Sequence, residues 1–174
     1  MQIITSYPED YIYSYFLKLF KEVTNRGIEG ATQYAVIQLV NYLVYNGFLP
    51  PQPLVMELLQ KMAEYIRQTQ INFHSFSNAF SVFRFFASFS EDRSDVQRVC
   101  LRELFAYLTN RTVKIRDQAF DQIIELLLQK GVDVKTIEKY CKMEWMLVNV
   151  QKAAAQRKEV ADEMGLDWLG DFEV

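Results

Sequence analysis

Side chains that could carry out catalysis are sparse in this sequence. His74 is the only histidine among the 174 residues. A helical wheel places it on the polar side of a phenylalanine-rich segment, and it forms no nucleophilic triad there. A solvated histidine is a more common interpretation of such a position than a general base. The sequence therefore predicts no catalytic residue.

The carboxylates of Asp117, Asp121 and Glu125 recur at intervals of four residues. This spacing is typical of a solvated or charge-pairing helix face rather than of a general acid and base. The glycines fall at the ends of predicted helices, so the sequence contains no glycine-rich loop that could cradle a phosphate. An enzyme on a helical scaffold, such as a DNA glycosylase, would also need a basic concave face. We predict a protein that is not an enzyme and holds no cofactor.

The two cysteines, Cys100 and Cys141, each lie within an amphipathic segment and show no CxxC spacing. Free buried thiols in a reducing compartment are the plain interpretation. A zinc site needs about four ligands, and a single histidine with two distant cysteines does not supply them. The sequence predicts no metal site.

The charge pattern and hydropathy exclude two classes of partner. The net charge is −3, the isoelectric point is about 5.3, and no block of five or more Lys or Arg occurs. A nucleic-acid groove needs clustered basic residues, so we expect no nucleic-acid binding. No apolar run approaches the ~20 residues that cross a bilayer, and residues 1–10 do not form a signal peptide. We therefore expect a soluble cytoplasmic protein.

The apolar residues recur with a helical period, and glycines, prolines and polar turns separate the periodic segments. Alternation typical of strands is absent. The predicted helices cover about residues 6–25, 31–45, 54–69, 72–89, 95–108, 113–130, 133–141 and 144–164. Short links between them predict an all-α fold of antiparallel helical hairpins. Two architectures fit this pattern, a closed bundle and an open α-solenoid.

The segment NFHSFSNAFSVFRFFASF, residues 72–89, favours the solenoid. It contains seven phenylalanines, and its apolar arc covers roughly 200° against the ~100° of a surface helix. Such an arc requires neighbours on two sides, so we expect Phe76, Phe80 and Phe83 in the core of a HEAT/armadillo-like stack. Phe85 projects among the polar residues and is either a partner contact or a contact with the next hairpin.

A second segment, TNRTVKIRDQAFDQIIELLLQKG at residues 109–131, matches the start of the second helix of a HEAT repeat. A polar cap is followed by Val-x-x-Arg and then by a small residue, Ala119, which permits close helix approach. Arg116 is a candidate partner contact, although pairing with a carboxylate of the adjacent repeat is the favoured interpretation. Trp145 is expected to pack at the junction of the last hairpin.

Residues 1–166 are interpreted as one helical-repeat domain of about eight helices, and residues 167–174 as an acidic-aromatic tail. Trp168 and Phe172 alternate with acidic residues in this tail and are candidate partner contacts. Two alternatives remain open: the tail folds back over the last helices, or it is a disordered peptide that docks elsewhere.

These segments together resemble a known family. The run SDVQRVCLRELFAYLTNRTVKIRDQAFDQIIELLL (residues 94–128), the EW pair at 144–145 and VQKAAAQRKEVADEMGL (150–166) are similar in order and spacing to the C-terminal domain of the tubulin-specific chaperone D family, also called tubulin-folding cofactor D. The stretch LLQKMAEYIRQTQ (58–70) fits the preceding part of that domain. The resemblance covers residues 10–166.

The resemblance implies a non-catalytic domain of a large helical-repeat chaperone with further repeats preceding residue 1. It implies β-tubulin as client and tubulin-folding cofactors E and C and an Arf-like small GTPase as partners in assembling and disassembling the α/β-tubulin dimer. GTPase activation would be a property of that complex. Cytoplasmic localisation, with cytoskeletal or centrosomal association, follows from the same resemblance. The alternative is a HEAT-type adaptor or scaffold in another intracellular complex.

Overall fold

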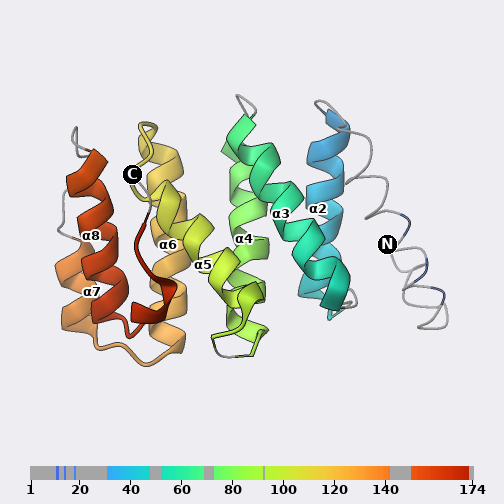
Figure 1. Ribbon diagram of the computed structural model, residues 1–174. Coiled ribbons are helices and arrows are strands. Elements are labelled where there is room, and N and C mark those ends of the chain that lie inside the picture. Colours follow the sequence, from blue (N-terminus) through green and yellow to red (C-terminus); the bar gives the residue numbers. More distant parts are fainter. Residues whose placement is uncertain are drawn as a thin grey trace. The chain divides into compact units, whose positions relative to one another are not determined.

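The computed structural model contains helices and short turns (Figure 1). It describes residues 11, 14, 18, 31–47, 52–68, 73–91, 93–141 and 150–172. The helices are α2 (Ala31–Tyr45), α3 (Gln52–Gln68), α4 (Phe73–Phe89), α5 (Asp95–Tyr107), α6 (Val113–Gln129), α7 (Val134–Cys141), α8 (Val150–Glu163) and the short 3-10 helix η2 (Asp167–Leu169). These ranges contain no strand, which confirms the predicted all-α fold. The helix predicted to begin near residue 6 falls mostly outside them.

The chain divides into two compact units, Met1–Ile71 and Asn72–Val174. In the first unit, α3 buries a broad apolar face that includes Leu58 and Ala63 as well as a row of four further side chains. Val55, Leu59, Met62 and Ile66 form this row, and each is almost fully buried. Within the described ranges, no helix is long and apolar enough to cross a membrane.

The second unit is built around α4, as its phenylalanine content predicts. Every described side chain from Phe76 to Ser88 is buried or half-buried. Phe80 and Phe83 are completely buried, and the rings of Phe76 and Phe80 pack against Tyr107 of α5 with centroid distances of 5.5 and 5.1 Å. A helix with this degree of burial has neighbours on more than one side.

Those neighbours are α5 and α6. Arg84 contacts Gln122 and Glu125, and Ser88 contacts Gln129, so residue numbers rise together along both helices and α4 runs parallel to α6. In Figure 1 α5 runs in the opposite direction. Two antiparallel hairpins thus share α5, which is the predicted helical-repeat arrangement within this unit.

The turn between α4 and α5 is held by one buried amide. Ser94 caps α5 by accepting a hydrogen bond from the backbone N–H of Gln97. The side chain of Gln97 accepts from the backbone N–H of Arg93 at 2.8 Å and donates to the carbonyl of Ala87 at 3.0 Å. Arg93 adopts a left-handed conformation with φ 61°. Gln97 therefore satisfies main-chain groups on both sides of a tight turn.

Glycines end α6 and α8 where the sequence predicts helix ends. Gly131 and Gly165 have φ values of 75° and 71°. In each case the next residue donates its N–H to a carbonyl five positions back, from Val132 to Leu127 and from Leu166 to Ala161. This is the Schellman pattern, in which a residue without Cβ adopts the left-handed conformation at little cost.

Candidate functional site

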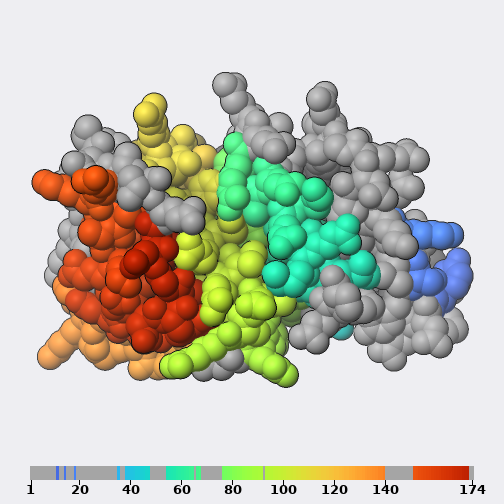
Figure 2. Space-filling view, in the orientation of Figure 1, coloured from blue at the N-terminus to red at the C-terminus, as the bar shows by residue number. Residues whose placement is uncertain are grey.

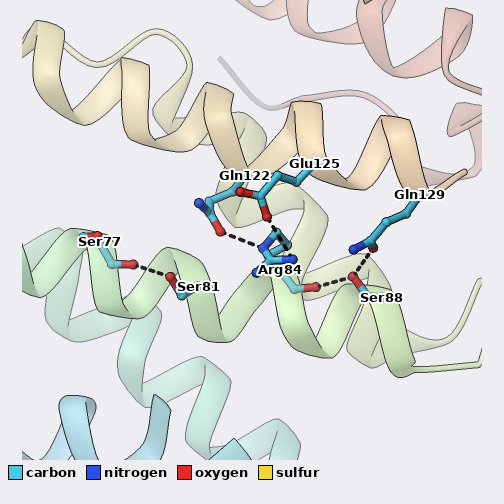
Figure 3. A network of polar contacts seen from close by, with 7 residues as sticks. All are labelled: Ser77, Ser81, Arg84, Ser88, Gln122, Glu125 and Gln129. Atoms are coloured by element: carbon cyan, nitrogen blue, oxygen red, sulfur yellow. Dashed lines mark hydrogen bonds and ion pairs between the residues drawn. The ribbon is translucent and has the colours of Figure 1, made fainter. Parts of the chain in front are cut away.

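The polar edge of α4 faces α6 and forms a seam between the two helices (Figure 3). The guanidinium of Arg84 donates to the Gln122 side-chain oxygen at 2.8 Å and lies 3.0 Å from the Glu125 carboxylate. The Arg84 side chain is only 13% exposed. The hydroxyl of Ser88 donates to the side-chain oxygen of Gln129. These side chains join neighbouring helices, so this face of α4 is used within the fold.

This seam was not identified from the sequence. The sequence did contain an indication of this seam, because Arg84 is the only charged residue in the apolar segment 72–89. A lone cation in a helix that must be buried on two sides needs a carboxylate or amide partner from a neighbouring helix. Glu125 and Gln122, spaced three residues apart, supply both.

Within the described residues, no ion pair joins Arg116 to a carboxylate of the adjacent repeat, which was the favoured interpretation of this residue. Its guanidinium donates to the main-chain carbonyls of Asn110 at 2.7 Å and Arg111 at 3.3 Å. The side chain folds back over the turn before its own helix and satisfies two carbonyls of that turn. Ala119 of the same helix is completely buried, in keeping with a position of close helix approach.

The acidic row on α6 lies at the surface. Asp117 and Asp121 are exposed, and Glu125 is engaged by Arg84. Partial burial raises the pKa of the Asp121 carboxyl, and the nearby charges of Asp117 and Glu125 raise it further. This spacing therefore produces mutual repulsion along a solvated face.

Cys100 is a free thiol buried in the core, and burial raises its pKa above the ordinary range. A protonated thiol without solvent access is inert as a nucleophile or ligand. The side chains of His74, Cys141 and Trp145 lie outside the described residues. Among the described side chains, no group of three His, Cys, Asp or Glu residues could hold a metal ion.

Two stacked phenylalanine rings lie at the C-terminal end of α4. Phe89 falls on the apolar arc of a helical wheel drawn for residues 72–89, yet it is 72% exposed. Phe85 is half-buried, and its ring stacks on that of Phe89 with a centroid distance of 4.5 Å and an interplanar angle of 30°. Phe85 also packs edge-on against Phe86. We call Phe85 and Phe89 the aromatic pair; within it the Phe89 ring presents a preformed apolar surface to solvent.

The C-terminal segment Leu166–Phe172 folds back onto α5 and α8, so the first of the two alternatives for the tail is correct for these residues. Leu166, Leu169 and Phe172 are buried. The guanidinium of Arg102 donates to the main-chain carbonyls of Leu169 at 2.7 Å and Asp171 at 3.2 Å. In Figure 2 the red atoms of this segment lie directly against the yellow-green atoms of α5.

The ring of Phe172 packs against one aromatic ring and two guanidinium groups. It stacks on Phe105 with a centroid distance of 5.6 Å. The guanidinium carbons of Arg102 and Arg157 lie 5.5 and 5.6 Å from its centre. Trp168 is half-buried, and Arg98 lies 5.8 Å from its ring. Contacts of this length are typical of cation–π interactions.

The structure brings two of the four predicted contact residues together and separates the others. Trp168 and Phe172 both contact arginines of α5. Phe85 lies on α4, and Arg116 lies in the first turn of α6. Phe172 is 7% exposed, so it would reach a partner only after the segment undocks. Arg102 was not identified from the sequence as a contact of this segment, because its partners Leu169 and Asp171 lie more than sixty residues away along the chain.

No protein-family model, curated protein or solved structure matches this chain.

Proposed function

We propose that this chain is a non-catalytic protein-binding domain of a tubulin-folding cofactor. Its client would be β-tubulin. Tubulin-folding cofactors E and C and an Arf-like GTPase would be its partners in assembling and disassembling the α/β-tubulin dimer. The aromatic pair on α4 supports protein binding. The order and spacing of the segments between residues 58 and 166 support the assignment to tubulin folding.

The aromatic pair has the properties of an interaction hot spot. Large rings combine extensive apolar area with few rotatable bonds, and they dominate protein interfaces for that reason. Phe89 leaves 72% of its surface in water, and covering that surface is worth about 2 kcal/mol. Its stacking on Phe85 orients the ring before a partner arrives, which lowers the entropic cost of binding.

A pull-down tests this function and the surface at once. The tagged chain, wild type or Phe85→Ser/Phe89→Ser, is incubated with cell extract and the retained proteins are probed for α- and β-tubulin. Tyr45→Ser is the matched control, because Tyr45 is also a largely exposed ring, 59% accessible, but lies on α2. We expect wild type and Tyr45→Ser to retain tubulin and the double variant to lose most of it.

The outcomes separate the proposed function from its alternative. Retention of tubulin by all three proteins would support the proposed function but show that the aromatic pair is not the tubulin contact. Absence of tubulin from every sample, with other proteins retained, would favour a HEAT-type adaptor in another complex. Circular dichroism of the double variant shows whether its helices are intact.

A further inference from the structure

The face that receives the C-terminal segment has the chemistry of a peptide-binding site. We call it the arginine seat and define it by Arg98, Arg102 and Phe105 of α5 and Arg157 and Lys158 of α8. Four of these five residues are cations, although the whole chain carries a net charge of −3. A local concentration of positive charge in an acidic protein attracts an acidic ligand.

The segment on the seat is complementary in charge. Lys158 Nζ lies 3.1 Å from the Asp171 carboxylate, and that hydrogen bond raises the pKa of Lys158. Asp167 adds a second negative charge near the same lysine. Aromatic rings alternate with these acids, so the segment presents both kinds of group that the seat recognises.

Arg102 recognises backbone rather than side chains. Both of its hydrogen bonds go to main-chain carbonyls, those of Leu169 and Asp171, on either side of Gly170. Carbonyl groups are common to every peptide, so this contact holds any segment with a similar turn. Specificity then depends on the ring that enters beside Phe105 and on the charges that flank it.

The arginine seat contains a guanidinium N–H donor that the segment does not bind. Arg157 is 9% exposed, donates to the Thr109 hydroxyl at 3.0 Å and packs against the Phe172 ring. Its Nε–H is buried and has no hydrogen-bond partner within the described part of the chain. Burial lowers the pKa of Arg157, and the adjacent charge of Arg102 lowers it further. A carboxylate beside the ring would neutralise this pair.

We propose that the arginine seat is a binding site for a partner's peptide that carries an aromatic residue flanked by acidic residues. The chain's own segment Leu166–Phe172 occupies this site in cis and competes with the partner. The segment follows α8 directly, so its effective concentration at the seat is on the order of millimolar. The apparent affinity of a partner peptide for the intact chain is therefore the intrinsic affinity multiplied by the fraction of seats that are open.

The test uses the full chain and a fluorescent synthetic peptide, LDWLGDF, that copies residues 166–172. Peptide binding is measured by anisotropy with the wild type and with Phe172→Ala, whose own segment lacks its anchor ring. We expect Phe172→Ala to bind the peptide at least about tenfold more tightly than the wild type. Asp171→Arg provides a second opened form, because Asp171 is 87% exposed and its replacement leaves the core intact.

Seat variants identify where the peptide binds. Adding Arg102→Ala to Phe172→Ala should abolish binding, whereas adding Arg111→Ala should not, because Arg111 is an exposed arginine in the turn before α6. Raising the salt concentration should weaken binding through screening of the cationic seat.

Three results would overturn the proposal. Equal affinity for the wild type and both opened variants would show that the segment does not compete. Absence of binding to either opened variant at about 1 mM peptide, the effective concentration of the segment in cis, would show that the seat only completes the fold. A concentration-dependent dimer of the wild type that Phe172→Ala abolishes would assign the seat to the segment of a second copy.

Discussion

Replacing Arg84 by methionine measures how strongly the polar seam joins α4 to α6. Methionine keeps the unbranched apolar stem of the side chain but removes the guanidinium and its contacts with Gln122 and Glu125. The fold of each helix should be unaffected, because both contacts cross from one helix to the other. The variant therefore removes both described contacts that Arg84 makes across the seam.

The loss of stability in Arg84→Met can be estimated from the burial of the groups that Arg84 contacts. The hydrogen bond to Gln122 at 2.8 Å contributes about 1 kcal/mol. The pair with Glu125 contributes at most about 1 kcal/mol, because that carboxylate is 51% exposed and screened by water. Removing a guanidinium that is only 13% exposed also removes its desolvation cost, which offsets part of the loss. We expect a net loss of about 0.5–1.5 kcal/mol and a fall in Tm of roughly 1–6 °C.

Urea unfolding followed by circular dichroism gives the free energy, with Arg111→Met as the control for a surface arginine. A double-mutant cycle with Glu125→Gln should return a coupling of about 0.5–1 kcal/mol that shrinks in high salt. An Arg84→Met protein as stable as the wild type to within about 0.3 kcal/mol, with an unchanged m-value, would refute the reasoning.

Three further predictions follow from single residues. Gln97→Leu should cost about 2–3 kcal/mol in urea unfolding, because it leaves the two main-chain groups of the α4–α5 turn without their partner. Hydrogen bonds from Thr136, first from its side chain, lower the pKa of Asp133. Asp133 therefore adds stability that is fully present above its unfolded pKa and lost as the pH falls through its folded pKa, so Asp133→Asn should flatten Tm against pH below about pH 4. Cys100 should resist alkylation at pH 8 in the native protein and react after unfolding, as mapped by peptide mass spectrometry.

The helices of the second unit follow from local signals in the sequence. The predicted bounds 95–108, 113–130 and 133–141 lie within one residue of α5, α6 and α7 at each end. Ser94 and Asp133 cap helices through side-chain hydrogen bonds, and Gly131 ends α6. Such signals act over a few residues, so they can be identified without knowledge of the tertiary structure.

Contacts between helices could not be predicted in the same way. Periodicity indicates which face of α4 is buried, but not which residue of α6 lies opposite Arg84. That pairing depends on the axial register of two helices 38 or more residues apart. For the same reason the sequence did not indicate that Arg116 donates to a main-chain carbonyl of the preceding turn. Phe89 was assigned to the core because a wheel takes no account of where a neighbouring helix ends.

The position of the C-terminal segment could not be predicted either, because it depends on contacts with residues distant in the sequence. Its composition suits both a docked and a disordered peptide, and the deciding contacts come from arginines on α5 and α8. Arg102 meets Leu169 across 67 residues of sequence. These groups meet because η2 contacts both α5 and α8.

Hydrogen exchange of the chain with and without purified tubulin tests the proposed function most directly. We predict that tubulin slows amide exchange at the C-terminal end of α4, around Phe85–Ser90, and that Phe85→Ser/Phe89→Ser removes this protection. Identical exchange in every peptide of the wild type, at tubulin concentrations of about 10 μM that saturate a typical specific complex, would contradict the proposal.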